Sequence, residues 1–182
     1  MPVIDLLENM PLLKSPNLRL EELALRGIPY GCAASDFPVS LVSQVTLAPI
    51  VKRSAWSTES GATYQDEHGN QLSLSEVIAN ALQFGGTLHL PGGVSFGFEG
   101  GRVTSLGIYG EGLEFFRYIK NYQQFAGEFG KPDSVSSEDA HGDLMGYKHY
   151  YAKCKKVVIW DEFKRRLVVI NFGMKQYAAG DA

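Results

Sequence analysis

The sequence predicts an α+β fold with a mainly antiparallel sheet, and three observations support this class. Apolar residues alternate on both sides of a Glu-Gly-Gly-Arg turn within residues 94–109, which is typical of a β-hairpin. Aromatic residues recur at three- and four-residue steps over 114–129, which predicts a helix with a wide apolar face. Residues 147–172 then hold three β-branched or aromatic runs separated by short polar turns, as in an antiparallel meander.

The helix predicted over 114–129 is expected to pack on this sheet. Its end is marked by Gly130, which can take the left-handed conformation of a helix cap, and by Pro132, which cannot continue a helix. Such a stripe of aromatic residues is more typical of core packing than of a ligand site. The stripe consists of Phe115, Tyr118, Ile119, Tyr122, Phe125, Ala126 and Phe129, and Arg117, Lys120, Asn121 and Gln124 fall on the other side.

A smaller helix is predicted over 74–84. Ser73 and Glu76 have the spacing of a capping box, in which each side chain accepts a hydrogen bond from the other residue's backbone amide. Two consecutive glycines follow Phe84 and end the helix, and a short strand is expected after them.

The chain is predicted to form a single domain over 1–182. Residues 1–37 are expected to be a helical or irregular N-terminal segment, and residues 39–173 the α+β core. Within the N-terminal segment, residues 18–26 fit a short helix, although their leucines alternate well enough for a strand to remain possible.

The composition is that of an ordinary globular protein, with 20% charged residues and a net charge of −3. No apolar run approaches the roughly 18 residues needed for a membrane-spanning helix. The N-terminus carries acids among its apolar residues and has no basic region, so we expect no signal peptide and a cytoplasmic location.

Charge is unevenly distributed in the last third of the sequence. Residues 145–175 contain eight Lys or Arg against two acids, a net charge of +6. The preceding residues, 133–143, contain no Lys or Arg, and we interpret them as an acidic connecting loop. Because charge complementarity speeds association and sets specificity, the loop predicts a binding surface for a basic protein. The predicted partner-binding residues are Asp133, Glu138, Asp139, His141 and Asp143.

The sequence lacks the motifs of common hydrolases, P-loop NTPases and dinucleotide-binding proteins. Its glycines between positions 92 and 101 turn one strand into the next, whereas a phosphate-binding glycine loop opens a helix. No pair of histidines has metal-binding spacing, so we predict no catalytic residue, no metal site and no cofactor. One alternative is a small-ligand or metal-using enzyme built on residues 138–149, where His141 and His149 accompany several acids.

A second alternative is nucleic-acid binding by the basic meander. Tyr147, His149 and Tyr151 share one face of a predicted strand among several lysines, which is typical of a stacking platform for bases. The isoelectric point near 5.8 argues against a dedicated nucleic-acid binder. A further alternative is a phage or secretion-system assembly component, which the sequence does not separate from the other hypotheses.

The arrangement of residues 92–173 resembles that of small bacterial immunity proteins of polymorphic or secreted toxin systems. The resemblance rests on a Gly-Gly-Arg-Val turn at 100–103, Phe-Gly-Lys-Pro-Asp at 129–133, Val-Ile-Trp-Asp at 158–161 and Leu-Val-Val-Ile at 167–170. A helix ending in Phe-Gly-Lys-Pro-Asp also occurs in small outer-membrane assembly lipoproteins, but this chain has no lipobox cysteine near its start. The resemblance carries over no functional residue.

The resemblance implies a non-catalytic cytoplasmic protein that binds and neutralises a toxin with a basic surface. This is the leading functional hypothesis, because such an inhibitor needs only a surface that covers the toxin and matches its charge.

Overall fold

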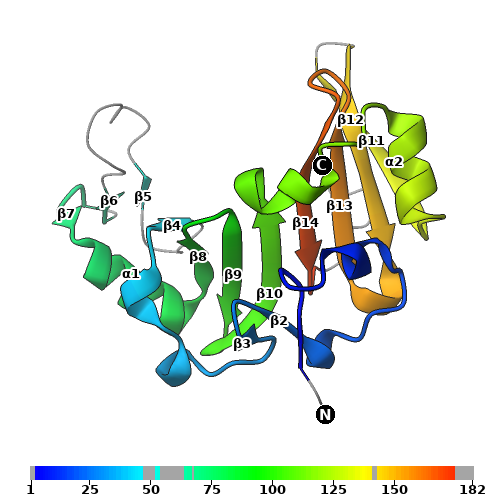
Figure 1. The fold of residues 1–182 in the computed structure, drawn as a ribbon. Helices are drawn as coiled ribbons and strands as arrows, with labels where there is room; N and C mark the ends of the chain where they lie inside the picture. Colours follow the sequence, from blue (N-terminus) through cyan, green and yellow to red (C-terminus); the bar gives the residue numbers. More distant parts are fainter. Residues whose placement is uncertain (1–2, 47–51, 54–63, 67, 141–142, 175–182) are drawn as a thin grey trace. The chain divides into compact units, whose positions relative to one another are not determined.

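The computed structural model describes residues 3–46, 52–53, 64–66, 68–140 and 143–174, and it confirms the α+β class with a large, mainly antiparallel sheet (Figure 1). The hydrogen-bonded strand order of this sheet is β11-β12-β13-β14-β10-β9-β8-β4. The chain folds as two compact units, residues 1–30 with 105–182 and residues 31–104. The prediction of one domain over 1–182 stays a prediction.

The strands of the main sheet are β4 (Gln44–Thr46), β8 (Gly86–Leu90), β9 (Val94–Glu99), β10 (Arg102–Tyr109), β11 (Ser134–Ala140), β12 (Asp143–Tyr151), β13 (Lys156–Asp161) and β14 (Arg166–Phe172). Two small sheets are formed by β1 (Ile4–Asp5), β2 (Leu23–Leu25) and β3 (Ile28–Pro29), and by β5 (Lys52–Arg53), β6 (Tyr64–Gln65) and β7 (Gln71–Leu72). The α-helices are α1 (Leu74–Phe84) and α2 (Tyr122–Phe129), and 3₁₀ helices span Met10–Lys14, Leu20–Glu22, Ala34–Asp36, Val39–Leu41, Gly110–Phe116 and Ala152–Cys154.

Helix α1 begins and ends where the sequence predicts. The Ser73 backbone amide donates to the Glu76 carboxylate at 2.8 Å, and the Glu76 amide donates to the Ser73 hydroxyl oxygen at 3.3 Å. Gly85 follows with a φ of 104°, a conformation that favours glycine. Val77 and Ala81 lie on the buried face. The local signals at both ends of this helix therefore fix it.

The helix predicted over 114–129 is interrupted, which corrects the expected boundaries. The 3₁₀ helix Gly110–Phe116 comes first, and α2 begins only at Tyr122. Asn121 is extended (φ −153°, ψ 163°), and its side-chain oxygen accepts a hydrogen bond from the Gln124 amide at 2.9 Å. Gln124 in turn accepts from the Lys120 amide at 2.7 Å. This Asn121 cap, together with the Gln124 contact to the preceding residue, starts a new helix inside the aromatic stripe.

Helix α2 packs its aromatic residues against β12 and β13, as the stripe predicts. The Phe125 ring stacks on Trp160 with ring centroids 5.5 Å apart, and Tyr122 stacks on Tyr147 at 3.8 Å. Phe125 and Phe129 are buried. Phe115, in the 3₁₀ helix, and Tyr118, in the connection to α2, remain 45% and 47% exposed. Of the predicted stripe, only Ile119, Phe125 and Phe129 are buried in the core.

The N-terminal segment 1–37 contains short 3₁₀ helices and also the small sheet β1-β2-β3, so residues 23–25 take the strand alternative. The segment is held to the C-terminal strands by a buried cation. The Lys156 ammonium donates to the backbone carbonyls of Leu13 at 3.0 Å and Ser15 at 2.8 Å. These hydrogen bonds give the buried ammonium two backbone acceptors.

Candidate functional site

The acidic segment 133–143 is mainly a strand pair and not a connecting loop, which corrects the sequence interpretation. Ser134–Ala140 form β11, which pairs with β12 in an antiparallel register from Ser134 opposite Tyr150 to Ala140 opposite Asp143. A bulge interrupts the register between Glu138 and Asp139. The serines and acids disfavour a strand locally, but pairing with a neighbour overrides such weak preferences.

The structure brings together three of the five predicted partner-binding residues. Glu138 and Asp139 occupy the end of β11, and Asp143 begins β12, so all three lie at the turn end of the hairpin. Asp133 lies at the opposite end, where its carboxylate accepts a hydrogen bond from the Ala152 amide at 2.7 Å. It therefore has a structural partner. His141 lies outside the described residues.

Strand β11 forms one edge of the main sheet. Its only neighbour in the strand order is β12, so no described strand pairs with its outer side. Val135 is 50% exposed, and Ser136 and Ser137 are also exposed. Edge strands present a row of backbone donors and acceptors to which another chain can pair. The register with β12 is regular from Ser134 to Glu138, so this part of the strand is the expected place for such pairing.

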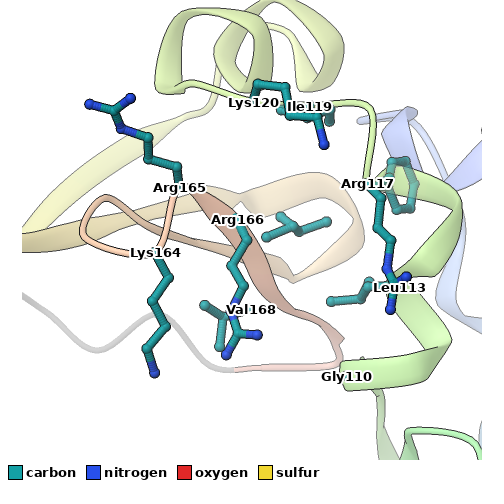
Figure 2. A pocket seen from close by; sticks show the side chains of 11 residues that line it. Gly110, Leu113, Arg117, Ile119, Lys120, Lys164, Arg165, Arg166 and Val168 are labelled. Carbon is teal, nitrogen blue, oxygen red and sulfur yellow. The ribbon is translucent and has the colours of Figure 1, made fainter.

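A pocket of about 390 Å³ lies beside the turn between β13 and β14 (Figure 2). One wall comes from the 3₁₀ helix Gly110–Phe116 and the residues that join it to α2, and the other from residues 164–168. The lining includes five cationic side chains and five apolar ones. The cations are Arg117, Lys120, Lys164, Arg165 and Arg166, and the apolar residues are Leu113, Phe116, Ile119, Leu167 and Val168.

The two acids of the β13–β14 turn are engaged in local structure. An Asp161 carboxylate oxygen accepts from the Lys164 amide at 2.7 Å, which closes the turn. A Glu162 carboxylate oxygen accepts from the Trp160 indole at 2.8 Å. Arg165 completes the turn with a φ of 47°. The turn therefore directs its acids to its own backbone and core while its basic residues line the pocket.

Sequence reasoning placed the pocket cations in separate groups. Residues 164–166 belong to the predicted basic segment, whereas Arg117 and Lys120 were assigned to the outer side of a continuous helix. The Asn121-x-x-Gln124 start signal indicates where that helix is interrupted. This signal would have placed Arg117 and Lys120 in a connection between two helices, where side chains need not follow the helical stripe.

The aromatic platform proposed for nucleic-acid binding is not on the surface, which corrects that expectation. His149 and Tyr151 are each only 1% exposed, and Tyr147 stacks on Tyr122. Lys156 is fully buried, with its ammonium 4.4 Å from the centre of the Tyr151 ring. Burial lowers the pKa of Lys156 to about 8. His149, Tyr151 and Lys156 belong to the core, so they offer no stacking surface to bases.

His149 also has a structural environment. Its Nε2 is 2.9 Å from the Tyr122 hydroxyl, and its ring packs 4.7 Å from that of Phe125. Burial lowers the pKa of His149 to about 4, so the ring is neutral near pH 7. Among the described residues, no group of three or more His, Cys, Asp or Glu is placed to hold a metal ion. The contacts of His149 therefore add no candidate catalytic residue to the alternative of an enzyme built on residues 138–149.

In the described part of the chain, no helix is long and apolar enough to cross a membrane. No protein-family model matches the sequence, and no curated protein or solved structure is significantly similar to it.

Proposed function

We propose that this chain is a non-catalytic protein-binding module whose partner docks on the edge strand β11. The supporting observation is that the acidic segment is an ordered strand with an outer side that no described strand occupies. A partner segment in extended conformation adds to such an edge through main-chain hydrogen bonds. The small, exposed side chains of Ser136 and Ser137 leave room for that approach.

The charge at the turn end of the hairpin selects the partner. Glu138, Asp139 and Asp143 follow one another closely there, and no Lys or Arg interrupts them. A partner strand flanked by basic residues would place positive charge beside this cluster, which speeds association and disfavours acidic competitors. We propose that the partner is a bacterial toxin and that docking blocks it, as the sequence resemblance to immunity proteins implies.

The test is a growth-protection assay combined with co-purification. The chain is co-expressed with the toxin candidate encoded by the neighbouring gene, and growth and complex formation are measured. We expect protection and a complex that weakens with added salt. Salt screens the attraction between exposed charges, and the screening length is about 10 Å at 0.1 M. The variant Glu138→Lys/Asp139→Lys should lose both, since it replaces two attractive charges by two repulsive ones.

The matched control is Glu8→Lys, which reverses an exposed acid in the N-terminal segment. It should protect as well as the parent chain. Failure of the parent chain to protect would refute the neutralising role, and equal protection by the double variant would refute the acidic hairpin as the docking site.

A further inference from the structure

The pocket beside the β13–β14 turn has the size and the shape of a ligand site. Its volume of about 390 Å³ falls in the range of pockets that hold small organic molecules, which is roughly 300–1,000 Å³. All of its lining comes from residues 110–120 and 164–168, within a single compact unit of the chain. The site is separate from the edge strand β11, so it does not depend on the docking proposed above.

The electrostatics of this pocket call for an anion. Arg117 is paired with the exposed carboxylate of Glu114. Within the described residues, the other four cations, Lys120, Lys164, Arg165 and Arg166, make no ion pair, and the acids of the turn are already engaged. A concentration of positive charge around one hollow attracts anions. The cluster also stands out against the net charge of −3 of the whole chain.

The directions of the side chains indicate which cations contact the anion. In Figure 2, the Arg117 and Arg166 side chains extend along the two sides of the pocket past Leu113 and Val168, whereas Arg165 is directed away from Arg166. Guanidinium groups offer paired N–H donors that match the oxygens of phosphate, and they remain charged at any physiological pH. Arg166 and Arg117 are therefore the expected phosphate ligands, and Arg117 would exchange its exposed Glu114 partner for the phosphate.

We propose that this pocket binds a small organic phosphate of mononucleotide size. Its phosphate groups lie between Arg117 and Arg166, with Lys120 and Lys164 compensating the remaining charge. Its less polar part contacts Leu113 and Val168, one from each wall of the pocket. The phosphate is held here by side chains, and no glycine loop or helix N-terminus is required.

Two features favour this ligand class over others. A single carboxylate would neutralise only one of the four cations without an ion pair, whereas a diphosphate carries two or three negative charges in one compact group. The apolar residues of the lining, of which Val168 is the most exposed, favour a ligand that also has a non-polar part, which inorganic phosphate lacks. A long polyanion would need a continuous basic groove, whereas these cations lie around one hollow.

The test is calorimetric titration of the full chain with three kinds of probe. Nucleoside diphosphates with each of the four common bases represent the proposed class, pyrophosphate supplies the charge without the planar part, and succinate supplies carboxylates. We expect at least one nucleoside diphosphate to bind about tenfold more tightly than pyrophosphate, because only the nucleoside diphosphate has a less polar part that can contact Leu113 and Val168. Succinate should not bind detectably.

Variants locate the binding. Arg117→Ala and Arg166→Ala should each weaken the nucleoside diphosphate about tenfold or more, since each removes a charge-assisted contact. Both side chains are exposed, so their removal should leave the fold intact. The matched control is Lys131→Gln, which removes one exposed positive charge outside the pocket lining and should change affinity less than about twofold.

Several outcomes would overturn the proposal. Absence of binding at about 1 mM for all four nucleoside diphosphates would mean an affinity too low for a ligand site. Equal binding of pyrophosphate would remove the organic part of the ligand. Tighter binding of a single-stranded oligonucleotide than of any mononucleotide, with a steep salt dependence, would identify a polyanion surface instead. Unchanged affinity in both arginine variants would place the ligand elsewhere.

Discussion

The hairpins β11–β12 and β13–β14 are consecutive in the chain and belong to one sheet, yet they offer different kinds of surface. The first ends in acidic residues and lies at the edge of the sheet, where no described strand continues it. The second carries basic residues at its turn and has the interrupted helical segment 110–120 beside it, which creates a pocket.

This difference shows that the surroundings of a hairpin decide which kind of surface it offers. An open edge offers a line of backbone groups, which suits an extended polypeptide. A turn faced by a second element offers a hollow with convergent side chains, which suits a small ligand. The two proposals are therefore separable, and variants that affect one hairpin should spare the other.

The largest effect is expected from Gly146→Ala in β12. A methyl group added to Gly146 would lie 2.3 Å from the backbone carbonyl oxygen of Trp160, closer than non-bonded atoms approach. Because the obstacle is backbone, β12 must shift, and we expect the free energy of unfolding to fall by about 2–3 kcal/mol. Urea denaturation measures the loss, and protection against the toxin should fall with it.

Gly127→Ala in α2 is the matched control for this substitution. Among the described residues no atom lies within 4 Å of the added methyl group, and Gly127 is in the interior of the helix. Alanine is favoured over glycine there, so stability should stay equal or rise by up to about 1 kcal/mol. Equal destabilisation by the two variants would contradict the close approach between β12 and β13.

The second-largest effect is a loss of stability at low pH, and it should begin in the hairpin β11–β12, which contains His149. The folded-state pKa of His149 is about 4, below its ordinary value near 6.5, so the unfolded chain binds the proton more readily. Stability is therefore lost as pH falls from about 6.5 to 4, on the order of 3 kcal/mol in total. Because His149 lies in β12 and contacts Tyr122, amides of β11 and β12 should lose exchange protection first.

His149→Phe removes the titrating group and should flatten this part of the stability profile, as measured by urea midpoints between pH 4 and 7. His68→Gln, which replaces an exposed histidine, should keep the slope of the parent chain. A parent profile that is already flat over this range would show that His149 is accessible to protons in the folded state.

The parts of the fold that local signals determine could be predicted from the sequence. Helix α1 is fixed by Ser73, Glu76 and Gly85, all within one turn of its ends. Strand β11 could not be recognised, because its serines and acids become a strand only through pairing with β12. The sequence shows that this segment is acidic, but it does not show that the segment forms a strand.

The candidate pocket could not be predicted from local sequence signals for a related reason. It joins residues near 117 to residues near 166, and nothing in either stretch indicates the other. Neighbouring lysines show the same limit. Lys155 is exposed with a φ of 44°, whereas Lys156 is fully buried and donates to two carbonyls of the N-terminal segment. The charge pattern places both lysines in the basic segment, but only Lys155 can contribute to a basic surface.

The smallest effect should come from Asn121→Ala, which acts on the pocket and spares the acidic hairpin. The substitution removes the side-chain oxygen that accepts from the Gln124 amide, and loss of such a cap costs about 1 kcal/mol. Fraying of the first turn of α2 would also loosen Lys120, so affinity for the nucleoside diphosphate should fall a few-fold while toxin protection persists. Gln123→Ala, at an exposed position in the same turn, should leave both unchanged. If Asn121→Ala weakened protection as strongly as ligand affinity, the two surfaces would be coupled through α2, and the separation between the hairpins would not hold.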